Sequence, residues 1–145
     1  MKILKSTALV LFFALIISSL FACAPVSETV TTYDEAQTNA LRAKVAGKWT
    51  LSEFTVGSET YSFEEYCEKE NANPEEQAIS FTFNEDGTGE GTFGKNKTSL
   101  TFLFDGSLVT VTTENGSTGF NYDKAKDAFF IYDENSNTYG YLTRE

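Results

Sequence analysis

Residues 80–93 read Ser-Phe-Thr-Phe-Asn-Glu-Asp-Gly-Thr-Gly-Glu-Gly-Thr-Phe, a run in which two strands and the turn between them can be recognised. Apolar and polar residues alternate on the N-terminal side of the tetrapeptide 84–87, and small and polar residues alternate after it. This is the pattern of two half-buried strands joined by a tight turn. Gly87 suits the left-handed position of a type I turn with a bulge. The stretch therefore predicts an antiparallel hairpin.

The register of this hairpin twice places a large ring opposite a glycine. Phe83 falls across from Gly89, and Phe81 falls across from Gly91. A ring that covers a strand glycine replaces the packing that the missing side chain would have supplied. Both phenylalanines are therefore expected on the buried face of the sheet.

Alternation with regularly spaced turn residues continues to the end of the chain. Eight strands are predicted, at about 47–56, 78–84, 88–93, 98–104, 107–114, 117–122, 128–133 and 138–144. The face expected to be buried carries Ile79, Phe81, Phe83, Phe93, Leu100, Phe102, Val109, Val111, Phe120 and Tyr122. An antiparallel meander with one apolar face must pack a second layer or close on itself, and small barrels close at eight strands. The expected fold is all-β, an eight-stranded antiparallel up-and-down barrel.

Two further hairpins are marked by Asp105-Gly106 and Asn115-Gly116, which are strong signals for two-residue turns. If these dipeptides are the turns, they fix the register of the neighbouring strands. The predicted cross-strand pairs are Phe102 with Val109 and Val111 with Phe120.

The loop at 123–127 leaves the last hairpin with two registers. One register points Phe129, Ile131 and Leu142 inward. The other points inward an aromatic set made of Phe130, Tyr132, Tyr139 and Tyr141. We favour the first, because aliphatic residues tolerate a dry core better than several tyrosines that need hydrogen-bond partners. It leaves an aromatic stripe on the outside.

Two short helices are expected outside the strands. Thr32 and Glu35 form a capping box before a helix that precedes the first strand. In the insertion between strands one and two, Ser62 and Glu65 form a second capping box. The helix that follows places Phe63, Tyr66 and Cys67 on one face, where they would cover one end of the barrel, either as a short lid or as a simple plug.

The N-terminus is typical of an exported protein. Basic Lys2 and Lys5 precede the apolar run 8–17, which is too short for a comfortable membrane span. The following Leu-Phe-Ala-Cys, which ends at Cys23, resembles the bacterial lipobox. We therefore expect a lipoprotein signal peptide at 1–22, a lipidated Cys23 with a flexible tether at 23–32, and one domain at 33–145. The alternative is an ordinary secretory signal.

Charge and composition limit the classes of function that the chain is expected to have. The formal net charge is −10, which excludes nucleic acid as a partner. The chain has no histidine, the usual general base and metal ligand, and we expect no catalytic residue, no metal site and no cofactor. If Cys23 carries lipid, Cys67 has no partner for an intramolecular disulfide. The chain is expected to be a non-enzymatic protein of the cell envelope, held at the membrane by its lipid.

The first strand opens with Gly47-Lys48-Trp49, which matches the glycine-any-tryptophan signature of lipocalins. Residues 40–145 resemble the lipocalin-like domains of bacterial envelope lipoproteins, although the second lipocalin signature, threonine-aspartate-tyrosine, is absent. The resemblance implies a barrel closed at the tryptophan end, a helix before it and a long first loop as a lid. It also implies that a late arginine, here Arg144, packs across the indole of Trp49.

Two functions fit this barrel. The first is binding of a small apolar molecule inside it, with a wall and lid formed by Phe63, Tyr66, Phe81, Phe83, Phe102, Val109, Phe120, Phe129 and Ile131. The second is a dry-core envelope module, of interaction or inhibitor type, that binds another protein through its loops or outer aromatic stripe. The two differ in one observable, because a ligand of ordinary size needs a cavity of at least a few hundred cubic ångströms.

Overall fold

The computed structural model describes residues 34–145, so the predicted signal peptide, Cys23 and the tether lie outside the described residues. The helices are α2 (Glu35–Val45), α3 (Phe63–Glu70) and α4 (Pro74–Gln77). The strands are β1 (Gly47–Val56), β2 (Glu59–Ser62), β3 (Ile79–Phe83), β4 (Thr88–Phe93), β5 (Asn96–Phe104), β6 (Leu108–Thr113), β7 (Gly116–Asp123), β8 (Ala128–Asp133) and β9 (Thr138–Arg144).

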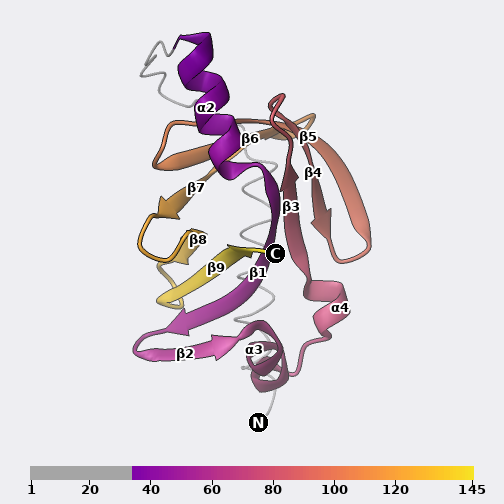
Figure 1. The fold of residues 1–145 in the computed structure, drawn as a ribbon. Coiled ribbons are helices and arrows are strands. Elements are labelled where there is room, and N and C mark those ends of the chain that lie inside the picture. Colours follow the sequence, from indigo (N-terminus) through magenta and orange to yellow (C-terminus); the bar gives the residue numbers. More distant parts are fainter. Residues whose placement is uncertain (1–33) are drawn as a thin grey trace.

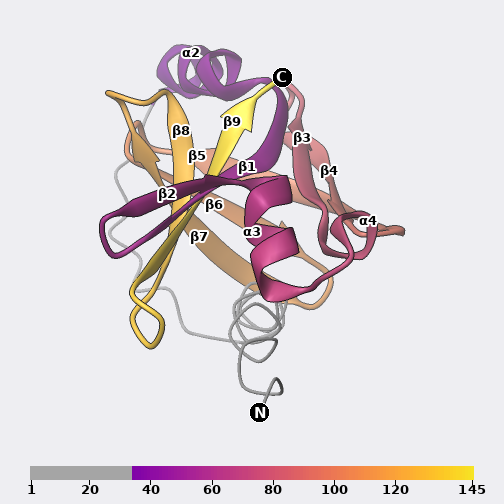
Figure 2. The same cartoon turned by 90° about the horizontal axis from the view of Figure 1, so that it is seen from below.

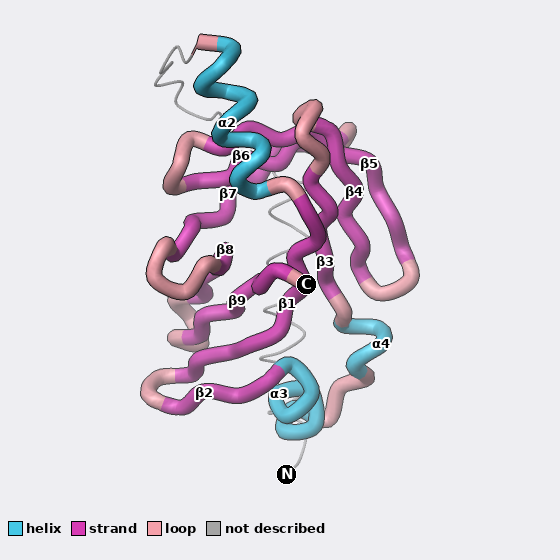
Figure 3. Tube along the Cα trace, in the orientation of Figure 1, coloured by secondary structure: helices cyan, strands magenta, loops and turns pink. Residues whose placement is uncertain are grey.

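β1 closes the sheet because it pairs along both edges. One edge pairs with β9 from Trp49 to Val56. The other edge pairs with β3 from Gly47 to Thr50. The order β1-β3-β4-β5-β6-β7-β8-β9 then returns to β1, which gives the predicted closed eight-stranded antiparallel barrel (Figures 1 and 3).

β2 is a short strand that the sequence analysis missed. Its four residues show no alternation of apolar and polar side chains, so no period marks them as a strand. It forms because β3 leaves the edge of β1 after Thr50, and a turn at Gly57, with φ 62°, folds the chain back onto the uncovered half of β1. The predicted helical lid follows as α3.

The 80–93 hairpin has the predicted register. Phe83 pairs with Gly89 and Phe81 with Gly91. Gly87 has a φ of 88°, the left-handed conformation expected at that point of the turn.

The register predicted for the hairpin between β5 and β6 is wrong by two residues. Phe102 pairs with Val111, not with Val109. The cause lies in Asp105, whose carboxylate accepts hydrogen bonds from the backbone amides of Ser107 and Leu108, both at 2.7 Å. Asp105 therefore occupies the first corner of the turn, and Gly106-Ser107 form its centre.

The next hairpin, between β6 and β7, is also shifted by two residues. Val111 pairs with Thr118, and Phe120 pairs with Val109. Thr113 and Gly116 form the closing pair, so Glu114-Asn115 form the centre of this turn. A shift of two residues keeps every side chain on its face, and the predicted inner positions are all buried or partly buried against the core.

The cap of α2 also differs from the prediction. Asp34, not Thr32, is the N-cap: its carboxylate accepts from the amide of Gln37, and the Gln37 side chain accepts from the amide of Asp34. Glu35 is thus the first helical residue instead of the third. The predicted capping box of α3, between Ser62 and Glu65, is present.

In the last hairpin the favoured register is confirmed. Phe129 and Leu142 are buried, and Ile131 is partly buried against the core. The two helices α2 and α3 lie at opposite ends of the barrel (Figure 1), and the view from the α3 end shows that helix lying over the strands (Figure 2).

Candidate functional site

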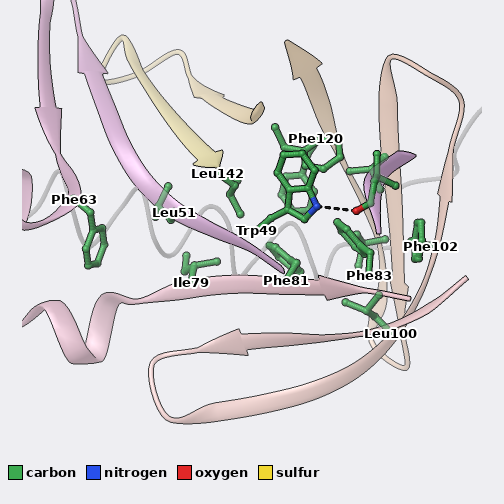
Figure 4. Packing of buried hydrophobic residues seen from close by; sticks show 14 of the residues in the cluster. Trp49, Leu51, Phe63, Ile79, Phe81, Phe83, Leu100, Phe102, Phe120 and Leu142 are labelled. Carbon is green, nitrogen blue, oxygen red and sulfur yellow. Dashed lines mark hydrogen bonds between the residues drawn. The ribbon is translucent and has the colours of Figure 1, made fainter. Parts of the chain in front are cut away.

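The closed end is built around Trp49, which is completely buried. Its indole nitrogen donates to the carbonyl of Val45 at the end of α2, at 2.8 Å (Figure 4). Arg144 is its cross-strand partner on β9 and places its guanidinium 4.4 Å from the centre of the indole ring. The predicted contact between Trp49 and Arg144 is present.

Arg144 also caps α2. Its two terminal nitrogens donate to the carbonyls of Ala46, at 2.5 Å, and Lys44, at 2.7 Å. These carbonyls would otherwise lack a partner at the end of the helix. Gly47 has a φ of 124°, and a Cβ there would lie 3.3 Å from the guanidinium. This end therefore joins helix, first strand and last strand in one structural contact.

The barrel interior is crossed by aromatic rings. Phe81 on β3 and Phe120 on β7 come from opposite sides of the eight-stranded ring, yet their ring centres lie 5.1 Å apart. Phe129 on β8 lies 6.0 Å from Phe83 and 6.0 Å from Phe104, measured between ring centres. Figure 4 shows several of these rings gathered around Trp49. At this level the walls are in direct contact.

All of the predicted wall residues belong to this core. Those less than 5% exposed are Phe81, Phe83, Phe102, Val109, Phe120 and Phe129. Ile131 is partly buried and packs against them. The sequence analysis placed these side chains on the correct face of the sheet. The distances between them across the barrel could not be predicted, because they depend on how the sheet closes.

The predicted lid residues are part of the same core. Tyr66 stacks on Phe54 of β1 with ring centres 4.2 Å apart. Phe63 also stacks on Phe54, with ring centres 6.4 Å apart. Cys67 is completely buried, and burial, with the negative charge of Glu64, raises the pKa of its thiol to about 11. A thiol with that pKa remains protonated at neutral pH and is a poor nucleophile.

Buried polar groups gather beside the lid. Burial raises the pKa of the Tyr66 hydroxyl, the charges of Glu70 and Asp133 raise it further, and a hydrogen bond with Thr138 acts in the opposite direction. The carboxylate of Asp133 accepts hydrogen bonds from its own turn, from Asn135 and Ser136. In the part of the chain that the structure describes, one oxygen of Glu70 is buried without a hydrogen-bond partner.

The outer aromatic face is formed by side chains of β8 and β9: Phe130, Tyr132, Tyr139 and Tyr141. The rings of Tyr132 and Tyr139 stack with centres 4.5 Å apart, and Phe130 lies within 6.0 Å of both Tyr139 and Tyr141. Tyr132 is 39% exposed. This face is the predicted aromatic stripe, and it lies outside the barrel.

A charged pair borders the outer aromatic face. Lys126, in the loop between β7 and β8, donates to the carboxylate of Glu53 on β1 at 2.6 Å. Its ammonium also lies 4.0 Å from the centre of the Tyr141 ring. The sequence analysis missed both charged residues, because the contact joins segments far apart in the chain.

Glu53 did leave a signal in the sequence. The inward residues of β1 are Trp49, Leu51, Phe54 and Val56, so the period of two breaks between Leu51 and Phe54. The structure has a β-bulge there, which turns Glu53 outward beside Tyr141.

Searches for other kinds of site and for relatives were negative. Within residues 34–145, no group of three or more histidine, cysteine or acidic side chains is arranged to hold a metal ion. No helix among these residues is long and apolar enough to cross a membrane. Comparisons with protein-family models, with curated proteins and with solved structures gave no match.

Proposed function

We propose that this chain is a protein-interaction module of the cell envelope, in which a rigid barrel presents the outer aromatic face to a partner protein with a basic surface. The observation that carries the proposal is the distribution of aromatic rings. One set meets inside the barrel across its full width, and a second set lies together on the outside.

The packed interior favours a role for the barrel as a scaffold. Because Phe81 and Phe120 touch across the barrel, a molecule at that level would have to separate them. Separating packed core rings gives up the apolar contacts that stabilise the fold. A small apolar ligand inside the barrel is therefore the weaker alternative.

The outer aromatic face has the chemistry of a protein interface. Tyrosine and phenylalanine are enriched at the centres of interfaces, where a rigid ring buries a large area at a small cost in side-chain entropy. The tyrosines here hold one another in place: Tyr139 stacks on Tyr132, and its ring centre lies 6.2 Å from that of Tyr141. Little ordering is left for a partner to impose.

Charge points to a basic partner. The chain carries 21 acidic and 11 basic residues, so its field attracts a positively charged surface and repels an acidic one. The exposed ring of Tyr132 and the half-buried rings of Tyr139 and Tyr141 also favour arginine and lysine, because a cation is attracted to the face of an aromatic ring.

The proposal includes the location of the protein at a membrane of the cell envelope. A lipid on Cys23 would hold the chain at a membrane through the segment that precedes α2. The lipocalin-like resemblance and the signal peptide belong to the same proposal. A closed barrel with a helix at its tryptophan end supports the resemblance.

In-cell photo-crosslinking tests this function. Benzoylphenylalanine would replace Tyr132 in one strain and, as a control, Leu103 in another. Leu103 is 63% exposed on β5, on the opposite side of the barrel. The proposal predicts one crosslinked protein at position 132 and none at 103, and its contact peptide should contain lysine or arginine. The crosslink should be lost when Tyr139→Ser is added.

Two results would contradict the proposal. The first is an equal crosslinking pattern at positions 132 and 103. The second is crosslinking at 132 that survives Tyr139→Ser in a variant whose thermal melting is unchanged.

A further inference from the structure

Glu53 and Tyr141 together form a site for a single cation. The two residues are direct cross-strand partners on β1 and β9, so a carboxylate and an aromatic ring stand side by side on the outer surface. The ammonium of Lys126 sits between them, 2.6 Å from the carboxylate oxygen and 4.0 Å from the ring centre. One cation thus meets a hydrogen-bond acceptor and a ring face at once.

The two walls of this site are held by the sheet, whereas the occupant comes from a loop. The bulge in β1 sets the backbone position of Glu53, and Tyr141 packs between other rings of the outer aromatic face. Lys126 lies in the turn that joins β7 to β8, where Asp123 accepts hydrogen bonds from the backbone of residues 125 and 126. The backbone positions of both walls therefore do not depend on the lysine side chain.

Another cation could replace Lys126 in its contacts with Glu53 and Tyr141 at a small cost in free energy. The side chain of Lys126 is 43% exposed and that of Glu53 is 35% exposed. Ion pairs between exposed side chains contribute little to stability, because water competes for both charges. An arginine has an advantage in such a place, since its planar guanidinium stacks on a ring and can make two parallel hydrogen bonds to a carboxylate.

We infer that Glu53 and Tyr141 form the receptor for one basic side chain of the partner, an arginine above all, and that Lys126 occupies this receptor until the partner displaces it. This inference rests on the proposed function, because the receptor borders the outer aromatic face. It adds a built-in competitor, so that a partner without a well-placed basic residue binds less well.

Titration of the full-length protein with a minimal probe tests the inference. The probe is N-acetylarginine amide, and the neutral control probe is N-acetylcitrulline amide, which has nearly the same shape. Binding is followed through the NMR shifts of the Tyr141 ring. The variants are Lys126→Met and Lys124→Met, which remove one positive charge from the same loop and so change the net charge equally.

The arginine probe should bind Lys126→Met about threefold more tightly than it binds Lys124→Met, a factor in keeping with the strength of exposed ion pairs. The citrulline probe should not distinguish the two variants. Adding Glu53→Gln to Lys126→Met should remove the gain. Equal affinities of the arginine probe for the two lysine variants would overturn the inference.

Different experiments test the receptor role of Glu53 and Tyr141 and the proposed function, so one can be contradicted without the other. If a crosslinked partner is found at position 132 but the two lysine variants bind the probe equally, the interaction module stands and the competitor role of Lys126 is withdrawn. If the arginine gain is found but no partner is crosslinked, the receptor exists and the proposed function is withdrawn.

Discussion

At the scale of single residues, the glycines of β4 show how closely the sheet is packed. A Cβ on Gly89 would collide with the backbone carbonyl oxygen of Thr82, a contact that only a backbone shift could relieve. A Cβ on Gly91 would lie 3.2 Å from the Phe93 ring and 3.3 Å from the Phe81 ring, contacts that a shift of a few tenths of an ångström in these side chains would relieve.

These contacts predict a graded effect. Gly89→Ala should lower the free energy of unfolding by more than about 2 kcal/mol, and Gly91→Ala by less than about 1 kcal/mol, because only the first forces backbone movement. Urea denaturation of both variants measures the difference. Equal losses would show that the register of β3 and β4 is not the one described.

Arg144 carries a second prediction at this scale. It stacks on Trp49 and donates to the last carbonyls of α2. Arg144→Ala should therefore cost about 1–3 kcal/mol and shift the fluorescence of Trp49. Arg144→Lys should recover only part, because an ammonium lacks the planar stacking surface. A melting temperature and a spectrum unchanged by Arg144→Ala would mean that this contact does not form in solution.

Tyr122 predicts the response of the protein to alkali. Its hydroxyl donates to the carboxylate of Asp127, and this hydrogen bond, together with burial, raises the pKa of Tyr122 to about 12. A raised pKa favours the protonated, folded form, so its contribution is complete below the ordinary tyrosine pKa near 10 and is lost as the pH rises towards 12. Tyr122→Phe should flatten the fall in stability over this pH range. A fall as steep as that of the wild type would assign the effect to other groups.

At the scale of elements, the turns decide the registers of the middle strands. The carboxylate of Asp105 accepts three hydrogen bonds within its turn, from the amides of Ser107 and Leu108 and from the Ser107 hydroxyl. In the next turn, Asn115 donates its amide to the Thr113 hydroxyl, a bond that does not use the asparagine side chain.

Asp105→Ala should therefore cost about 1–2 kcal/mol, whereas Asn115→Ala should cost less than about 0.5 kcal/mol. Thermal melting of the two variants is the measurement. If the larger cost fell on Asn115, the centres of the two turns would be the dipeptides that the sequence analysis chose.

The strands themselves could be read from the sequence because alternation is a local signal. Their inner faces were correct even where the register was not, since a shift of two residues preserves the face. The registers predicted from Asp105-Gly106 and Asn115-Gly116 were wrong because each dipeptide can stand at more than one position of a turn. β2 was not predicted for another reason. It pairs with β1 only because the pairing of β3 with β1 ends early, and no short window of sequence contains that information.

One part of the candidate site could be predicted from the sequence and the other part could not. The aromatic stripe of β8 and β9 follows from the alternation of apolar residues, so the sequence predicted it. The cation site does not, because Glu53 and Lys126 are 73 residues apart and meet only after β1 has paired with β9 and the bulge has turned Glu53 outward.

At the scale of the whole molecule, closure determines what the barrel can do. The sequence has thirteen phenylalanines, ten of them in residues 34–145, but their number does not say whether they line a cavity or fill it. That depends on the width of the closed sheet, which is set by strand number and stagger. In the structure, Phe81 and Phe120 meet across the middle, and α3 packs its rings on Phe54 at one end. The remaining aromatic surface, on β8 and β9, is on the outside.

If the barrel is filled by its own side chains, the rings of Phe81 and Phe120 must be in contact in solution, and NMR can detect that contact. The protein would be grown with isotope label in its own cells, purified without unfolding, and examined by NMR for magnetisation transfer between the ring protons of Phe81 and Phe120. With ring centres 5.1 Å apart, a strong cross-peak between the two rings is expected. Loss of that cross-peak, with transfer from both rings to protons of a bound molecule, would show that the barrel holds a ligand and is not filled by its own side chains.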